Sequence, residues 1–489
     1  MDALFNRAAA ESPGDVLGGN SFEVINVFTW SVLGVLAGAS VVLYAGQKLQ
    51  AKVLGIPVRP SHAGVPRTSN WVLFSFMGCY SLLVPGLICP LFSYNLSALG
   101  GNVEMAEATH SMLSFIQQLW GTNCTSGALL VVLYAIVVPA IKLVLLLLSE
   151  VWRRQGPEQV MKARRCVGVL QHISKWASPD MFAYVLLLFL MRSLNHPPTL
   201  QAVSQMDVGF TCFAVFCVGS TVAALGLRMP PLPDGAKEAE PRCFGWMRRP
   251  AVQAGIVALL FAAFVPLLIV GLSQPSMSLK VDPNGFFEPN GPLPEMLRPI
   301  VMSLGIEEIA HAEVSIWQCM GKLAEWAGSG EANSLIGFIL FAVCAVAATI
   351  VDMLLLLAAA LMTLRRAARP VTPSNEASAP AGRDGAEPLL LVRIAQVLKK
   401  LSFLDVAIVG IVVVVLGGQA YRVQGLILSM EMGLVPLFLA ETCHYLAYYL
   451  VAYAQPSGLD AARSIKLKEG GEPQQGQVSG APEALAVEV

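Results

Sequence analysis

Two charged side chains and a proline lie inside apolar stretches that are long enough to cross a bilayer. Pro139 and Lys142 lie near the middle of SGALLVVLYAIVVPAIKLVLLLL, and Asp352 lies in a second leucine-rich stretch. At a rise of about 1.5 Å per residue, about 20 residues cover the ~30 Å hydrocarbon core. A charge there is costly and marks a functional site by default, and a proline frees a carbonyl that protein or water must satisfy. Lys142 and Asp352 are therefore predicted to meet, either as a structural brace or as a gate for an ion or a lipid headgroup; the alternative is that they make no contact.

A second candidate pair lies in the last apolar stretch, where Glu441 and His444 are three residues apart and share one helix face. The spacing E-x-x-H occurs at iron sites of four-helix bundles, but such a site needs a facing acid or a second pair. We predict no metal and no cofactor. The pair either handles protons or headgroups, or is a hydrogen-bonded interior pair. Arg192, which closes another apolar stretch, completes the predicted inter-module polar site with Glu441, His444, Lys142, Asp352 and Pro139.

The composition indicates a polytopic membrane protein, because 55% of the residues are hydrophobic and only 13% are charged. A net charge of −1 supplies no field that would attract nucleic acid. No phosphate-binding loop, serine-hydrolase motif or zinc-protease motif occurs, so we expect no enzyme. The first twenty residues show no cleavable signal peptide, so the first apolar stretch is expected to stay as an anchor.

Window hydropathy predicts nine membrane spans. They are 24–46, 71–92, 127–148, 176–195, 208–227, 252–273, 334–363, 401–421 and 432–454. The fourth is the weakest, so eight spans are the alternative. Alternate connections are basic: 149–180 holds six Lys or Arg residues, whereas 93–126 holds none. By the positive-inside rule, the N-terminus is predicted to lie outside and the C-terminus in the cytoplasm. We expect the protein in the plasma membrane or an endomembrane.

Four further residues are predicted at the cytoplasmic ends of spans. Asp180 and Asp405 each follow a serine at a span start, where an acid caps free backbone N–H groups. Lys175 and Lys400 are interpreted as interfacial anchors that contact anionic lipid. Two N-x-S/T sequons, at Asn95 and Asn123, fall in one predicted outside connection and are possible glycosylation sites. 

The chain contains an internal repeat. The register H-x-x-[LV]-S-x-x-Q begins at His110 and again at His311, Lys142 aligns with Asp352, and the spacing Lys-x4-Asp occurs at Lys175 and Lys400. The predicted fold is all-α, with two repeated four-helix transmembrane modules and one extra N-terminal span. The domains are an N-terminal tail, extra span and cytoplasmic loop at 1–70; a first module at 71–228; a cytoplasmic linker at 229–250; a second module at 251–455 with a disordered insert at 369–388; and a disordered tail at 456–489.

The runs HSMLSFIQQL, PAIKL and KWASPDMF resemble the paraquat-inducible protein A family of four-span membrane modules. The resemblance covers roughly 71–228 and, more faintly, 251–455. Two modules and a partnership with mammalian-cell-entry-type lipid-carrying proteins are common in that family, so the resemblance implies lipid transport. This chain differs in lacking zinc-ribbon CxxC pairs, in its extra first span, and in Thr349 and Asp352, which align with Pro139 and Lys142.

We therefore expect a protein that takes part in phospholipid transport or membrane lipid homeostasis, with membrane lipids and a lipid-shuttling protein as partners. Two alternatives from other classes remain. One is a tetraspan-like scaffold that organises a membrane complex, and the other is a proton-coupled transporter of a small solute. A continuous polar cavity between the modules favours transport, whereas a dry, leucine-packed seam favours the scaffold.

Overall fold

The computed structural model describes residues 22–53, 68–98, 103–155, 157–197, 200–230, 249–282, 298–303, 311–368 and 387–454, with Asn284, Phe287 and Met296 between them. Within these residues, nine helices are long and apolar enough to cross a membrane, which confirms the predicted polytopic helical fold. Most of the predicted linkers and the whole predicted tail, 456–489, lie outside the described residues.

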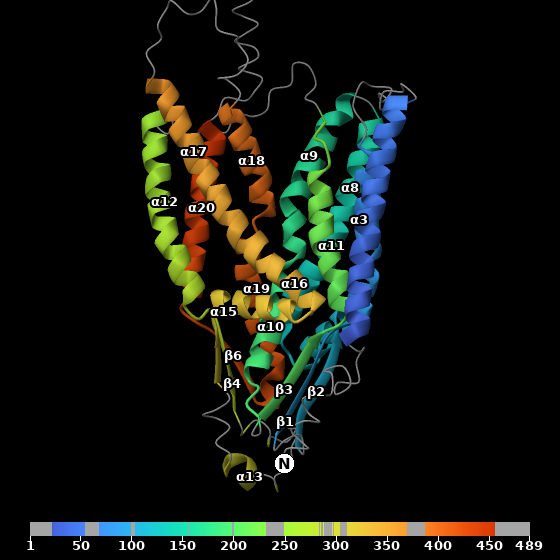
Figure 1. Ribbon diagram of the computed structural model, residues 1–489, viewed down its shortest axis with the longest axis vertical. Helices are drawn as coiled ribbons and strands as arrows, with labels where there is room; N and C mark the ends of the chain where they lie inside the picture. The colour runs from blue at the N-terminus through green and yellow to red at the C-terminus, as the bar shows by residue number, and fades with distance from the viewer. Residues whose placement is uncertain are drawn as a thin grey trace, which may run out of the picture.

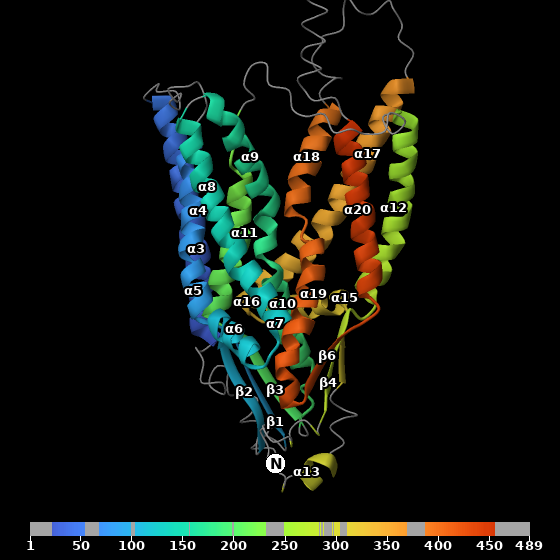
Figure 2. The ribbon, with the colours of Figure 1, turned by 180° about the vertical axis from the view of Figure 1, so that it is seen from behind.

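The membrane helices form two arms that join at one end (Figure 1). The first arm contains α3 (Phe22–Val53), α4 (Asn70–Ser81), α5 (Leu83–Ile88), α7 (Thr125–Val132), α8 (Val138–Arg154), α9 (Pro157–Ile173) and α11 (Val208–Leu225). The second contains α12 (Pro250–Ser273), α16 (Ala332–Phe338), α17 (Ala348–Ala368), α18 (Glu387–Leu401) and α20 (Leu434–Ala454). Where the arms join, α10 (Pro179–Ser193) packs against α19 (Leu404–Gly418), as Figure 2 shows from behind.

Two small antiparallel sheets lie beyond the joined end of the arms, almost wholly in the predicted connections between spans. In the first, β1 (Pro90–Ala98) lies between β2 (Val103–Ser111) and β3 (Leu200–Met206). In the second, β4 (Met277–Val281) lies between β5 (His311–Val314) and β6 (Leu426–Met430). The register pairs Tyr94 with Ala108 and Ser204.

The same order of elements occurs in both halves of the chain. A helix leads into the central strand of a sheet, the next strand leads into an amphipathic helix, and that helix is α6 (Met112–Gly121) in the first half and α15 (Ile316–Gly328) in the second. Both amphipathic helices begin with a serine capping box, at Ser111 and Ser315. Each is followed by a span with an internal π-helical stretch, at Leu133–Val137 and Ile339–Ala347.

The fourth and eighth spans are interrupted helices that begin earlier than the sequence predicts. The stretch 149–180, predicted as a basic cytoplasmic connection, is mostly helical: α8 runs to Arg154, and α9 leads through a 3₁₀ turn at Ser174–Ala177 into α10. Likewise α18 ends at Leu401 and α19 begins at Leu404. We call these two interruptions, 174–178 and 402–403, the helix breaks. Pro179 at the start of α10 explains the first, since proline fits the first turn of a helix but not its interior.

The seam between α10 and α19 is closely packed. Phe182 of α10 stacks edge-on against Phe341 at 4.8 Å between ring centroids and lies near Phe403. A Cβ on Gly410 of α19 would come within 2.7 Å of the Pro179 carbonyl oxygen, so this glycine permits the close approach. Such close packing between α10 and α19 is the property that we expect of a scaffold.

Helix α3, the predicted extra span, contacts both halves. Thr29 forms hydrogen bonds with Thr211 of α11 (2.8 Å) and with Asn333 of α16 (3.3 Å), and all three side chains are buried. Asn26 also donates to the carbonyl of Gly330 at 2.9 Å. The extra helix is thus fixed to the junction of the two arms at its N-terminal end.

Candidate functional site

The helix breaks leave backbone carbonyls without helical partners, and buried side chains satisfy them. Lys142 and Thr221 both donate to the carbonyl of Ser174, each at 3.1 Å. Lys175 donates to the carbonyl of Ser402 at 3.3 Å. A buried carbonyl without a hydrogen bond is costly, so these donors stabilise the interruptions.

Lys142 does not meet Asp352, so the predicted ion pair is wrong. The Lys142 ammonium donates to Ser220 of α11 at 2.8 Å as well as to Ser174, and it lies 5.6 Å from the centre of the Phe216 ring. Asp352 contacts His444 of α20. Equivalent residues of a repeat meet only if both point at the axis between the halves, and here each points at the last helix of its own half. Pro139 instead accepts a hydrogen bond from Tyr80 at its carbonyl, at 2.9 Å.

An ion pair links the two halves at the breaks. Lys175, from the first break, lies 2.5 Å from the carboxylate of Asp405 at the start of α19. The hydroxyl of Tyr445 donates to the same oxygen at 2.5 Å, and the other Asp405 oxygen accepts the backbone N–H of Val406 at 2.9 Å. Lys175 is 4% exposed and Asp405 is 8% exposed. Lys175 is therefore no interfacial anchor, and Asp405 caps one backbone group while binding an ammonium.

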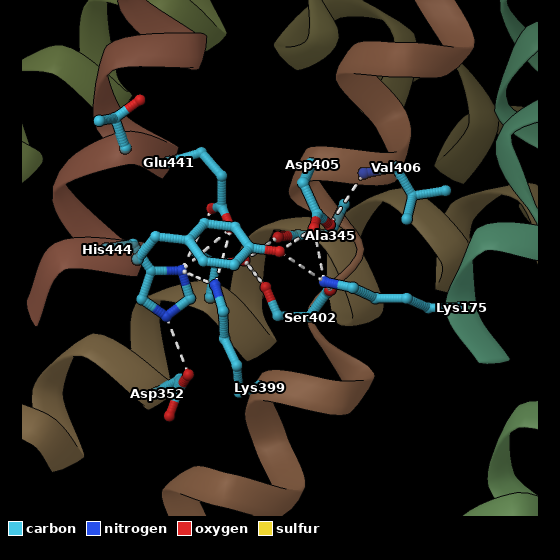
Figure 3. A network of polar contacts seen from close by, with 12 residues as sticks. Lys175, Ala345, Asp352, Lys399, Ser402, Asp405, Val406, Glu441 and His444 are labelled. Carbon is cyan, nitrogen blue, oxygen red and sulfur yellow. Dashed lines mark hydrogen bonds and ion pairs between the residues drawn. The ribbon is translucent and has the colours of Figure 1, made fainter. Parts of the chain in front are cut away.

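A second set of charges continues from this pair into the second arm (Figure 3). Lys399 of α18 donates to Glu441 at 2.9 Å, and its ammonium lies 3.1 Å from His444 Nδ1 and 3.4 Å from the centre of the Tyr445 ring. His444 Nδ1 lies 3.2 Å from Glu441, and its Nε2 lies 2.8 Å from Asp352. We call the whole set the break network: Lys175, Asp405, Tyr445, Lys399, Glu441, His444 and Asp352. The structure thus brings together Glu441, His444 and Asp352 of the predicted polar site.

Arg192 lies apart from the break network but also joins the two halves. Its guanidinium contacts both carboxylate oxygens of Glu331, at the start of α16, at 3.0 Å each. It also donates to the Ser204 carbonyl at 3.0 Å and lies 4.4 Å from the centre of the Trp326 ring. The pair lies at the end of the spans nearest the sheets.

Asp180 occupies the position equivalent to Asp405 but has no comparable partner. Both of its carboxylate oxygens are buried without a hydrogen bond, so its predicted capping role is wrong. It borders a cavity of about 20 Å³ whose other lining residues include Tyr184 and Tyr421, a volume that admits about one water molecule. Lys400, half-buried, donates to Gln171 at 2.7 Å, which places it between helices.

The sheet end of the molecule holds both sequons and one buried acid. Asn95 is half-buried in the central strand β1, whereas Asn123 is exposed just after α6. Burial raises the pKa of Asp207, although hydrogen bonds from Ser93 and Gln205 oppose that shift.

Sequence reasoning missed Tyr445, Lys399 and Glu331. Lys399 falls in the connection between the predicted spans 334–363 and 401–421, because hydropathy gives no sign that α18 and α19 are two parts of one interrupted span. The signal was present: Ser402 and Asp405 mark a helix start inside what is otherwise one long span. Within the described residues, no cluster of His, Cys, Asp and Glu has the arrangement of a metal site.

These features define a class: a polytopic helical membrane protein with interrupted spans and a buried ion network between its halves. Within that class, residues 76–229 match the family model described as Paraquat-inducible protein A. No curated protein matches the chain. A solved structure described as "Crystal structure of SecDF in Super-membrane-facing form" is 12% identical over 82% of this chain and 63% of its own chain, with a TM-score of 0.15. So low a TM-score supports no argument about the fold.

Proposed function

We propose that the protein moves phospholipids between its membrane and a lipid-carrying partner protein, without catalysing a covalent reaction. The match of residues 76–229 to the paraquat-inducible protein A family model carries this proposal. The interrupted spans support it, because discontinuous transmembrane helices are a recurring feature of the substrate and ion sites of transporters.

The charged residues at the helix breaks also favour a protein whose two halves change their contacts over a scaffold whose halves stay fixed. Well-packed apolar residues would hold two helices together as firmly as a buried ion pair, which is often no more stable than an apolar replacement. Yet Lys175 and Asp405 meet at 2.5 Å between the halves. A charged side chain can exchange one ion-pair or hydrogen-bond partner for another. Such side chains therefore suit helices that change their contacts during a transport cycle.

The scaffold is the second candidate, and the close packing between α10 and α19 favours it. The cavity beside Asp180 is about 20 Å³, and that beside Arg192 is about 10 Å³. Neither admits a lipid, so lipid movement requires the arms or the amphipathic helices to change position. A scaffold requires no such change.

Reconstituted vesicles distinguish the two candidates. The purified protein is placed in liposomes with a trace of fluorescent phospholipid, and transfer to an added lipid-binding acceptor protein or to acceptor vesicles is followed. We expect faster transfer than from protein-free liposomes, and loss of the increase in Lys175→Met. Lys322→Met is the matched control, because Lys322 lies in an exposed ion pair with Glu325. Transfer equal to that of protein-free liposomes, under acidic and neutral conditions on either side, would contradict the proposal and leave the scaffold.

A further inference from the structure

The break network contains one group whose charge is not determined by its partners. Lys175 pairs with Asp405, and Lys399 pairs with Glu441, so these four charges cancel. Asp352 and His444 remain, in contact at 2.8 Å and both fully buried. With Asp352 ionised, the network carries one negative charge when His444 is neutral and none when His444 is protonated. A buried net charge is costly, so one proton has a large effect on this network.

The surroundings of His444 Nδ1 offer two incompatible arrangements. Lys399 Nζ lies 3.1 Å from this nitrogen, and a Glu441 carboxylate oxygen lies 3.2 Å from it. A neutral imidazole with its proton on Nε2 accepts a hydrogen bond from Lys399 at Nδ1. A protonated imidazole donates from Nδ1 to Glu441 instead, and its new charge repels the Lys399 ammonium.

The other neighbours of His444 supply no competing charge at Nδ1. Nε2 faces only Asp352 of α17, whose second oxygen is buried without a hydrogen bond. From α12, Phe264 places its ring 6.2 Å away, and on α20 itself Tyr445 places its ring 6.3 Å away. The Tyr445 hydroxyl is engaged by Asp405, which in turn binds Lys175.

We propose that His444 Nδ1 is a proton-binding site that controls the contact of Lys399 at the second helix break. In the binding step, a hydronium ion gives up a proton to the Nδ1 lone pair: one of its O–H bonds breaks, the Nδ1–H bond forms, and a water molecule leaves. The Lys399–Nδ1 hydrogen bond breaks, a Nδ1–H bond to Glu441 forms, and the charge of the network rises by one. Lys399 lies three residues before Ser402, so proton occupancy acts directly on the interruption between α18 and α19.

This inference goes beyond the proposed function, because it assigns a proton as the ligand of a site in the second half. Only its use in driving lipid movement rests on the proposed function. Proton binding to His444 is measured in an assay that involves no lipid transfer. A negative result for proton binding therefore does not refute lipid transport, and a negative result for lipid transport does not refute proton binding.

The test is nitrogen-15 magnetic resonance of the full chain in lipid nanodiscs, with labelled histidine, between about pH 5 and pH 9. The chain has six histidines, and His444→Gln assigns the signal. We expect the His444 Nδ1 signal to change in one step from an unprotonated acceptor to a protonated donor. A signal that stays in one state over the whole range in which the protein is folded would overturn the proposal.

Lys399→Gln tests the coupling to the break. Removing an ammonium 3.1 Å from Nδ1 should make His444 bind the proton at least about tenfold more tightly, since that charge opposes protonation. Lys322→Gln, which removes an exposed ammonium, should leave proton binding unchanged. Equal proton affinity in Lys399→Gln and wild type would refute the role of Lys399. If Lys399→Gln does not fold, hydrogen-bond couplings between labelled lysine and His444 in the wild type replace it. They should be present at high pH and lost on protonation, and their persistence would refute the proposal.

Discussion

The ion pair between Lys175 and Asp405 allows the contact between the two halves to be tested by a double-mutant cycle. Each partner is less than one tenth exposed, and the pair is the direct charge contact between the first break and α19. Lys175→Met leaves a buried carboxylate with only the Tyr445 hydroxyl and one backbone N–H. Asp405→Asn leaves a buried ammonium beside a neutral amide. Breaking a buried pair in this way typically costs about 3–5 kcal/mol.

The double variant Lys175→Met, Asp405→Asn should recover most of that loss, because no uncompensated charge remains. We expect a coupling energy of about 2 kcal/mol or more, measured by reversible unfolding in mixed detergent micelles or, where unfolding is irreversible, by the rank order of thermal midpoints. The corresponding control, Lys322→Met, should shift the midpoint by no more than the scatter between preparations, because exposed pairs contribute about 0–1 kcal/mol. A coupling energy near zero, with the two single losses simply adding in the double variant, would show that the two charges do not stabilise one another, and the proposed contact between the halves would have to be abandoned.

Three further predictions concern other buried polar groups. Arg192→Lys should destabilise the protein by about 1–2 kcal/mol in the same unfolding assay. A lysine ammonium cannot reproduce the planar guanidinium, which contacts both carboxylate oxygens of Glu331 and the Ser204 carbonyl. An unchanged thermal midpoint would contradict a stabilising role for these contacts. Asp180→Asn should be no less stable than wild type, because the carboxyl group has no hydrogen-bond partner to lose; a loss above about 1 kcal/mol would show that an ionised carboxylate is stabilised there. Burial raises the folded-state pKa of Asp207 above its unfolded value, so its contribution to stability is complete at low pH and is lost as the pH rises through the folded pKa. Asp207→Asn should therefore gain stability relative to wild type as the pH rises above about 4, the ordinary pKa of an aspartate. Parallel pH profiles would refute the assignment.

The spans could be predicted from the sequence because hydropathy depends on composition alone. All nine predicted stretches overlap the nine candidate spans in the described residues. The helix breaks could not be found by the same rule, because α9 carries Lys and Arg residues and scores as a connection. Its partner face is nonetheless apolar: Val167 and Leu170 are fully buried. A search for helical periodicity, rather than mean hydropathy, would have placed α9 within the fourth span.

The sequence of β1 also has the alternating pattern of a strand. In β1, Phe92, Tyr94 and Leu96 alternate with Ser93, Asn95 and Ser97, which is the period of a strand. The pairing of β1 with β3, more than a hundred residues later, could not be deduced, because register between distant strands depends on the tertiary fold.

The contacts of Lys142 and Asp352 show why aligned positions predicted the wrong pairing yet pointed to the right helices. Lys142 reaches Ser220 of α11, and Asp352 reaches His444 of α20, which are the last membrane helices of their halves. The two contacts thus join corresponding helices but differ in chemistry. A lysine that donates to a hydroxyl and a carbonyl has no alternative acceptor within its contacts, so it holds the first break in one arrangement. A histidine between two acids and an ammonium has two arrangements that differ by one proton, so any proton-dependent movement of the breaks is expected to begin in the second half of the chain.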